Sequence, residues 1–180
     1  MLTLLTEEEI IDIYNEYMKE DFPPDELKPL SSMLEMLKRG IYACYGIYEG
    51  KTLLAYAYLT LIDNLVLVDY LAVVKDFRGS GIGTKFLTEL KSILADKTIV
   101  IECENPNFAT DCEDKNTRVS RINFYKNCDF VLSGVSSKLF GVEYVILTFP
   151  KCQNTAQALE KIYLKMLSKE SIKKNLIIKS

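Results

Sequence analysis

The stretch Arg78-Gly79-Ser80-Gly81-Ile82-Gly83 decides the fold of this 180-residue chain. It follows the largely apolar run Leu65–Val74 and opens a helical pattern of apolar residues that includes Phe86 and Leu90. A buried strand, a glycine-rich turn and a helix N-terminus in this order form a site suited to a pyrophosphate. Glycines let the backbone approach an anion closely, and the N–H groups and dipole of the first helical turn attract it.

Two familiar nucleotide-binding loops fail on spacing. A Walker loop places a glycine directly before its lysine, whereas Thr84 precedes Lys85 here. A dinucleotide fingerprint, G-x-G-x-x-G, needs its third glycine one position beyond Gly83. The spacing that fits is R-x-x-G-x-G, formed by Arg78, Gly81 and Gly83. After an apolar strand this pattern resembles the acetyl-CoA loop of the GNAT superfamily of N-acetyltransferases; a tight strand-to-helix turn without a ligand is the alternative.

A second motif downstream resembles another signature of the same family, roughly R-x-x-x-F-Y-x-x-x-G-F. It is the segment Arg121-Ile122-Asn123-Phe124-Tyr125-Lys126-Asn127-Cys128-Asp129-Phe130. The spacing departs slightly, because Arg121 lies three residues before Phe124, and Asp129 replaces the usual glycine. Aspartate adopts the left-handed conformation at modest cost, so we expect the turn to form. The resemblance covers most of residues 1–150 and implies an α/β (α+β) GNAT fold: a mixed, mostly antiparallel sheet, splayed at the acetyl-CoA site, with helices on both faces.

Periodicity and turn residues give the expected elements. Thr6 and Glu9 predict a capping box at the start of a first helix. A second helix is expected over 25–38, with Gly40 as its stop. The remaining pattern predicts strands over 41–48, 52–62 and 65–74, a helix over 82–93, a strand over 98–104, a helix over 117–127 and strands over 130–135 and 142–149.

Composition bounds the function. The net charge is −3 and the basic residues are scattered, so no footprint for nucleic acid is expected, which also disfavours a toxin-like enzyme acting on charged tRNA. No apolar run is long enough to cross a bilayer and no targeting leader is recognised, so no membrane partner is expected. The five cysteines form no C-x-x-C pair, which favours reduced thiols in the cytoplasm and predicts no metal site.

The chain has no histidine, so any proton transfer must use carboxylates, tyrosine, lysine, water or the backbone. The resemblance implies that the main chain of Leu71, Ala72 and Val73 binds pantetheine and the acetyl carbonyl. It also implies that the loop binds the pyrophosphate. The Arg78 side chain would either reach a phosphate or cap its own loop. The other loop residues expected to bind acetyl-CoA are Gly79, Ser80, Gly81, Ile82, Gly83 and Thr84.

The resemblance also makes Tyr125 the candidate general acid for the departing CoA thiolate, with a buried aromatic as the alternative role. Glu102 and Glu104 alternate along one strand and so share a face, where one could act as the base. We favour Glu102, with Asp69 as a third candidate. Cys103 alternates to the other face, and no residue is predicted to carry a covalent acyl group.

These observations predict an acetyl-CoA-dependent N-acetyltransferase in which a primary amine attacks directly within a ternary complex. Its acceptor would be a small molecule or a peptide amine; a non-catalytic acyl-CoA-binding sensor or scaffold is the alternative. Residues 1–150 are expected to form the catalytic domain. Residues 151–180 form an extension with an amphipathic helix over 155–167 that packs on the same domain, or else serves as a dimer contact or a lid. A monomer or a homodimer is expected.

Overall fold

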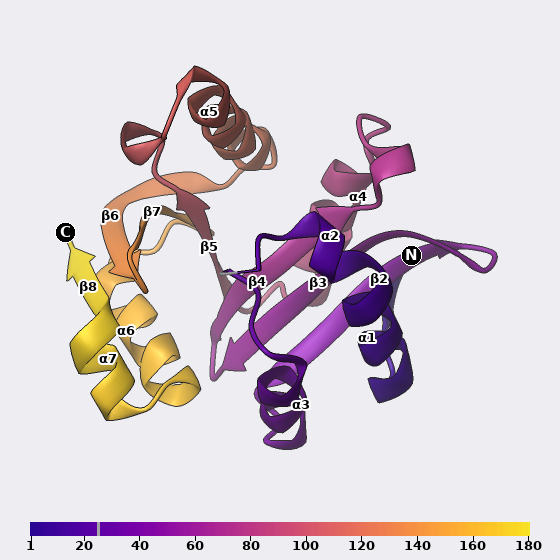
Figure 1. The fold of residues 1–180 in the computed structure, drawn as a ribbon, viewed down its shortest axis with the longest axis horizontal. Coiled ribbons are helices and arrows are strands. Elements are labelled where there is room, and N and C mark those ends of the chain that lie inside the picture. The colour runs from indigo at the N-terminus through magenta and orange to yellow at the C-terminus, as the bar shows by residue number, and fades with distance from the viewer. Residues whose placement is uncertain (25) are drawn as a thin grey trace. The chain divides into compact units, whose positions relative to one another are not determined.

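The computed structural model describes residues 1–24 and 26–180 (Figure 1). The chain divides into two compact units. The first comprises Met1–Leu61 and Val68–Ala95, and the second comprises Ile62–Leu67 and Asp96–Ser180. Strand β4 (Leu65–Val73) therefore contributes residues to both units. The predicted division into residues 1–150 and 151–180 stays a prediction.

The strands of the first unit are β1 (Leu2–Leu4), β2 (Tyr42–Glu49), β3 (Thr52–Ile62) and most of β4. The pairs β1–β2 and β2–β3 are antiparallel. All three strands predicted from 41 to 74 are confirmed to within a residue at each end.

Helices of the first unit surround its strands. They are α1 (Glu7–Ile13), which continues through a π-helical turn (Tyr14–Met18) into α2 (Lys19–Asp21), then α3 (Leu30–Lys38) and α4 (Ile82–Ile93). The predicted capping box is confirmed, with both reciprocal bonds between Thr6 and Glu9 present. The second helix was predicted to begin too early. It begins at Leu30, after Pro29, whose extended backbone (ψ 136°) stands at the N-cap; Asp25 itself lies outside the described residues.

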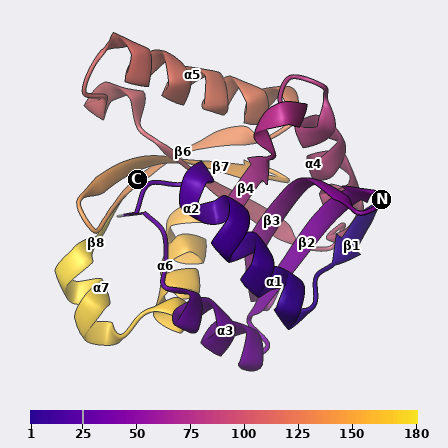
Figure 2. The ribbon, with the colours of Figure 1, turned by 45° about the vertical axis from the view of Figure 1, so that its right-hand side comes forward.

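Both faces of the first unit's strands are covered. The consecutive residues 55–60 of β3 are all buried, which requires packing on both faces because successive side chains alternate. The Tyr58 hydroxyl donates to the Ile10 carbonyl of α1 at 2.8 Å. Figures 1 and 2 show α1 lying over β2 and β3. Helix α4 contacts β1 instead, where the Leu2 N–H donates to Glu89 at 2.6 Å.

The second unit contains β5 (Thr98–Glu104), β6 (Val131–Leu139), β7 (Val142–Phe149) and β8 (Leu176–Lys179). The pairs β5–β7, β6–β7 and β6–β8 are antiparallel. The start of β5 lies beside the start of β4, because Thr98 N–H donates to Asn64 O at 2.8 Å. The sheet order is β1-β2-β3-β4-β5-β7-β6-β8, which confirms the predicted mixed, mostly antiparallel α/β fold. The splay expected at the acetyl-CoA site stays a prediction.

Helices of the second unit are α5 (Cys112–Asn127), α6 (Thr155–Met166) and α7 (Lys169–Asn175). The prediction placed the start of α5 five residues too late. The Asp111 carboxylate caps the helix at the Asp114 N–H (2.8 Å), so the polar residues before Thr117 are helical. Helix α7 and strand β8 were not predicted. In the part of the chain that the structure describes, no helix combines the length and apolarity needed to cross a membrane.

Candidate active site

The glycine loop, residues 78–84, joins β4 to α4 after a 3₁₀ turn (Lys75–Phe77). Gly79 (φ 78°) and Gly81 (φ 84°) are both left-handed, and Gly81 is the N-cap of α4. A Cβ at either position would meet nothing within 4 Å, so backbone conformation rather than space requires glycine. Gly81 has no side chain, so the N-cap residue itself does not cap this helix end. Its first-turn N–H groups and left-handed glycines therefore suit a bound pyrophosphate.

The Arg78 side chain ties the loop to its own unit. Its Nε donates to the Val73 carbonyl at 2.9 Å, and its Nη2 pairs with Asp21 of α2 at 2.6 Å. The Ser80 hydroxyl donates to the Phe77 carbonyl at 2.5 Å. Arg78 thus bonds to β4 and α2 rather than to other residues of its own loop. Contact with a phosphate stays a prediction.

The alternation of β4 breaks just before the candidate acetyl site. Tyr42 pairs with Thr60 in the β2–β3 register, so Tyr42 and Tyr58 lie on the same face of these strands. The Asp69 carboxylate accepts from the Tyr42 hydroxyl, and the Tyr70 ring stands edge-on to Tyr58 at 6.4 Å. Two consecutive residues thus reach one face. Beyond this break, residues 71–73 are only half-buried, whereas 65–68 are buried.

Tyr125 lies on α5, packed between Phe124 and Phe130 with ring centroids 5.1 and 5.9 Å away. Only 7% of the residue is exposed. Burial raises the pKa of Tyr125 well above its ordinary value; nearby Cys103 adds to the rise and Arg121 opposes it. The phenol therefore stays protonated at neutral pH and can donate a proton.

The turn after α5 forms without glycine, as predicted. Asp129 has φ 66°, in the left-handed region, and the Phe130 N–H bonds back to the Tyr125 carbonyl at 3.1 Å. This turn anchors Phe130 against the Tyr125 ring. The buried aromatic role of Tyr125 is therefore observed, and its role as an acid stays a prediction.

Glu102 lies on β5 with both carboxylate oxygens engaged by neutral hydroxyls. The Ser137 hydroxyl of β6 donates to Oε1 at 3.0 Å. The Tyr163 hydroxyl of α6 donates to Oε2. The sequence pattern predicted only an amphipathic helix over 155–167 here, and this contact of Tyr163 was missed. The signal available was its hydroxyl, since a buried tyrosine O–H usually finds a partner.

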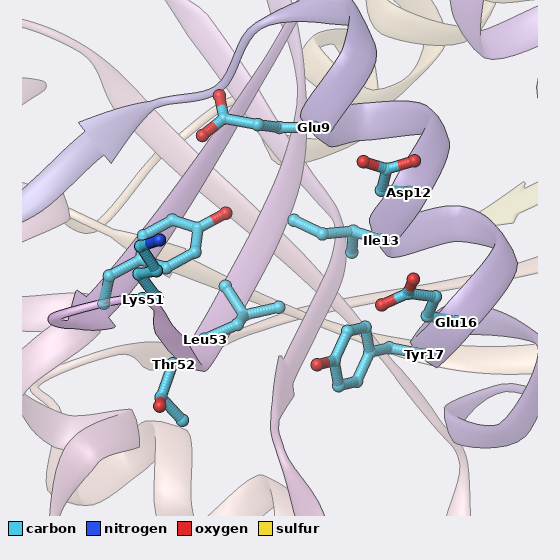
Figure 3. Close-up of a pocket in the computed structure, with 9 residues that line it drawn as sticks. Glu9, Asp12, Ile13, Glu16, Tyr17, Lys51, Thr52 and Leu53 are labelled. Atoms are coloured by element: carbon cyan, nitrogen blue, oxygen red, sulfur yellow. The ribbon is translucent and has the colours of Figure 1, made fainter.

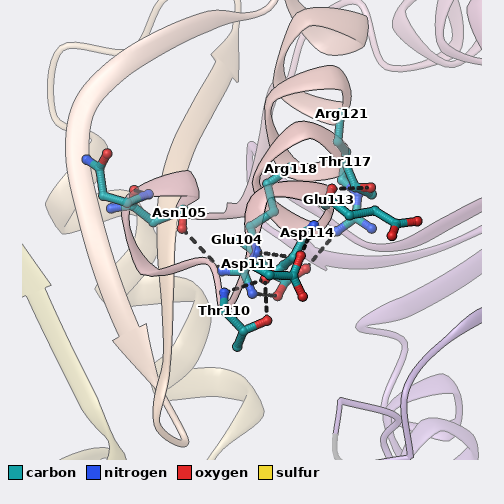
Figure 4. Close-up of polar contacts among 10 residues, drawn as sticks. Glu104, Asn105, Thr110, Asp111, Glu113, Asp114, Thr117, Arg118 and Arg121 are labelled. Carbon is teal, nitrogen blue, oxygen red and sulfur yellow. Dashed lines mark hydrogen bonds and ion pairs between the residues drawn. The ribbon is translucent and has the colours of Figure 1, made fainter.

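Glu104, two residues along the strand, is held by cations instead (Figure 4). Arg118 pairs with Glu104 at 2.9 Å and with Asp114 at 2.7 Å, and Arg121 pairs with Glu104 at 3.1 Å. Both arginines of α5 thus form ion pairs. Glu104 therefore joins the end of β5 to α5.

Cys103 lies between the two carboxylates in sequence and is buried. Burial raises the pKa of Cys103 to about 12, with Arg121 opposing and the two flanking glutamates adding. A thiol that stays protonated is a poor nucleophile, so Cys103 is not suited to carry an acyl group. Among the described residues, no group of three or more cysteine, aspartate and glutamate side chains is arranged to hold a metal ion.

A separate groove of about 430 Å³ lies in the first unit, between α1 with its π-helical turn and the β2–β3 hairpin (Figure 3). Three carboxylates face it and only one lysine does, so it would attract cations rather than anions. Its lining residues are Glu9, Asp12, Ile13, Glu16, Tyr17, Tyr48, Lys51, Thr52 and Leu53.

The fold and the loop together define an α/β protein with a glycine-rich turn and a helix N-terminus at the end of β4. Residues 8–130 match the Acetyltransferase (GNAT) family, so the chain belongs to this family. The chain is 35% identical over 116 residues to the putative acetyltransferase YjbC of Bacillus subtilis (strain 168). That match covers 64% of this chain and 55% of YjbC, so the chain spans about half the length of the curated relative it matches.

Solved structures show the same fold. A putative GNAT-family acetyltransferase from Bacteroides thetaiotaomicron has a TM-score of 0.70 at 20% identity, covering 95% of this chain and 98% of that one. The ribosomal-protein-S18-alanine N-acetyltransferase from Escherichia coli has a TM-score of 0.62 at 14% identity, covering 86% and 97%. A Bacillus subtilis acetyltransferase in complex with CoA has a TM-score of 0.53 at 18% identity, covering 82% and 95%. At these identities the likeness shows the fold alone.

Proposed function

We propose that this GNAT-family protein is an acetyl-CoA-dependent N-acetyltransferase that transfers the acetyl group to a primary amine by direct attack within a ternary complex. The observation that carries the proposal is the glycine loop, with Gly79 and Gly81 left-handed at the N-terminus of α4, where the N-cap residue is a glycine without a capping side chain. The family membership and the CoA complex of a protein with the same fold support it. The acceptor is a small molecule or a peptide amine.

In this proposal the loop N–H groups from Gly79 to Thr84 bind the pyrophosphate. The main chain of residues 71–73 pairs with pantetheine, and one of its N–H groups stabilises the oxyanion that forms as the amine attacks. A single such donor is worth roughly 3 kcal/mol in other enzymes. Positioning of the two substrates supplies most of the remaining acceleration.

Because the chain has no histidine, we assign proton transfer to a carboxylate and a phenol. We assign the base to Glu102 rather than Glu104. Both oxygens of Glu104 are held by guanidinium ion pairs, whereas Glu102 accepts from two neutral hydroxyls that can rotate away or pass on a proton. Tyr125 would donate to the departing thiolate.

A second candidate function is an acyl-CoA-binding sensor or scaffold without turnover. The observation that favours it is the engagement of both carboxylates, Glu102 by hydroxyls and Glu104 by arginines. A base that is fully occupied would slow the reaction and leave binding intact.

The test is release of CoA thiol from acetyl-CoA against a panel of small amines, diamines and peptides. Acetyl-CoA binding is measured in parallel by calorimetry, with ATP and NAD as competitors. We expect thiol release with one class of acceptor and no competition by either nucleotide. Binding without release across the panel would favour the sensor, and absence of acetyl-CoA binding would overturn both functions.

A further inference from the structure

The first unit contains a buried carboxylate whose partner is a lysine ammonium. Asp69 of β4 has a side chain only 6% exposed, and Lys28, between α2 and α3, reaches it with Nζ 2.5 Å from Oδ1. The Tyr42 hydroxyl of β2 donates to the other carboxylate oxygen at 2.6 Å. The Asp69 charge is therefore met by one ammonium and one phenol.

An aromatic ring completes the surroundings of the ammonium. Lys28 Nζ lies 5.2 Å from the centroid of the Tyr70 ring, and Phe22 packs edge-on against that ring at 4.9 Å. We call Tyr42, Asp69 and Tyr70 the ammonium cage. A carboxylate next to the face of an aromatic ring is the chemistry that recognises an alkylammonium ion.

Main-chain bonds also hold the Lys28 segment in place. The Lys28 main-chain N–H donates to the Tyr70 hydroxyl at 2.8 Å, and the Lys28 carbonyl accepts from the Tyr14 hydroxyl at 3.1 Å. The Tyr70 hydroxyl in turn donates to the Glu26 carbonyl at 2.8 Å. These main-chain bonds would survive loss of the ammonium. Replacing a buried ion pair by well-packed apolar residues is often neutral or stabilising. Stability alone therefore does not explain why Lys28 and Asp69 are paired here.

The cage lies next to the stretch proposed to hold the acetyl group. Asp69 precedes Leu71 by two residues, which is about 7 Å along a strand. The Lys28 side chain is 28% exposed, so part of it meets solvent. A primary amine that replaced this lysine stem would have its nitrogen in the cage, within two residues of the stretch 71–73 along β4.

We propose that the ammonium cage binds the primary ammonium of the acceptor and that Lys28 occupies it as an internal competitor. The inference rests on the proposed function and specifies its acceptor class, a primary ammonium on an unbranched alkyl chain like the lysine stem. In the transfer the bound ammonium first loses one proton to a base, which frees the lone pair for attack. The new N–C bond then replaces the C–S bond, the nitrogen loses a second proton, and the departing thiolate takes up one proton, so one proton is released overall.

The first test needs no activity. In Lys28→Ala the cage loses its tethered cation, and we expect n-butylammonium to raise the thermal midpoint of this variant but not of wild type. Lys161→Ala is the matched control, because Lys161 pairs with Asp63 at 2.7 Å on the surface of the second unit. The rise should disappear in Lys28→Ala/Asp69→Asn and shrink in Lys28→Ala/Tyr42→Phe, which serves if the first double variant does not fold. Equal shifts in all variants would overturn the cage.

The second test is kinetic. We expect Lys28→Met to lower KM for primary alkylamines at least fivefold without lowering kcat, and Lys161→Met to change neither. Butylammonium binding to Lys28→Ala with an unchanged KM in Lys28→Met would overturn the acceptor role. If no variant releases thiol with any amine, the proposed function fails and the acceptor role fails with it. The butylammonium shift would then still report separately on whether the cage binds an ammonium.

Discussion

Tyr125 combines a packing role with a hydroxyl that stays protonated. Its raised pKa, caused chiefly by burial, keeps the phenol neutral, so this residue by itself should not lower kcat up to about pH 10. Tyr125→Phe removes the donor and keeps the ring against Phe124 and Phe130. We expect kcat to fall about 10- to 100-fold, at the modest end of acid–base effects because a thiolate leaves readily.

The measurement is thiol release between pH 7 and 9.5 for Tyr125→Phe and wild type. The KM for acetyl-CoA and the thermal midpoint should stay close to wild type, since the aromatic packing is retained. An unchanged kcat would leave Tyr125 as a packing residue only.

The carboxylates of β5 show which features of single residues the sequence could predict and which it could not. Alternation correctly placed Glu102 and Glu104 on one face, because it depends only on neighbours in the chain. It could not predict that one meets hydroxyls and the other meets arginines. Tyr163 lies 61 residues from Glu102 and Ser137 lies 35 residues away, so their contacts depend on a strand order that local patterns do not encode.

At the scale of elements, the first turn of α4 contains a glycine that its helical conformation does not need. Gly83 lies inside α4, where alanine is more favourable by about 1 kcal/mol. We propose that glycine stands there because the backbone must approach the pyrophosphate closely. Gly83→Ala should therefore keep or raise the thermal midpoint while weakening acetyl-CoA binding about tenfold.

Two measurements on the same Gly83→Ala sample test this prediction. Thermal unfolding reports the stability, and calorimetric titration with acetyl-CoA reports the affinity. Gly81→Ala is the contrasting variant, because its left-handed φ of 84° makes any side chain strained, by roughly 1–2 kcal/mol. That variant should lose both stability and affinity. Normal acetyl-CoA affinity in Gly83→Ala would remove this residue from the binding site.

The elements that the sequence predicted well are those marked by glycine, caps or uninterrupted apolar runs. Strands β3 and β5 and helix α4 have the expected bounds. Helix α5 began earlier than predicted, because the side chain of Asp111 rather than an apolar stripe fixes its start. Strand β8 was missed because it depends on pairing with β6, about 40 residues earlier, and four residues carry too little pattern to predict a strand.

At the scale of the whole molecule, buried phenols make stability depend on alkaline pH. Burial is the main cause of the raised pKa values of four buried tyrosines, Tyr42, Tyr56, Tyr58 and Tyr125, and also of the half-buried Tyr48. In the unfolded chain each would ionise near pH 10, so the folded state holds these protons more tightly. Their contribution is fully present below pH 10 and is lost as the pH rises above it toward the folded pKa values.

Each tyrosine should lower the free energy of unfolding by about 1.4 kcal/mol per pH unit above pH 10, so four give roughly 5 kcal/mol per unit. The buried thiols of Cys44 and Cys103, whose pKa values are also raised by burial, act with the same sign from about pH 8.5. Because proteins are stable by only about 5–15 kcal/mol, we expect unfolding by about pH 12.

Urea midpoints between pH 8 and 11 measure how steeply the free energy of unfolding falls with pH. Tyr58→Phe should lower stability at pH 8, because it loses the bond to the Ile10 carbonyl, yet flatten the slope above pH 10 by about a quarter of the tyrosine contribution. A slope unchanged in this variant would mean that Tyr58 ionises equally in both states.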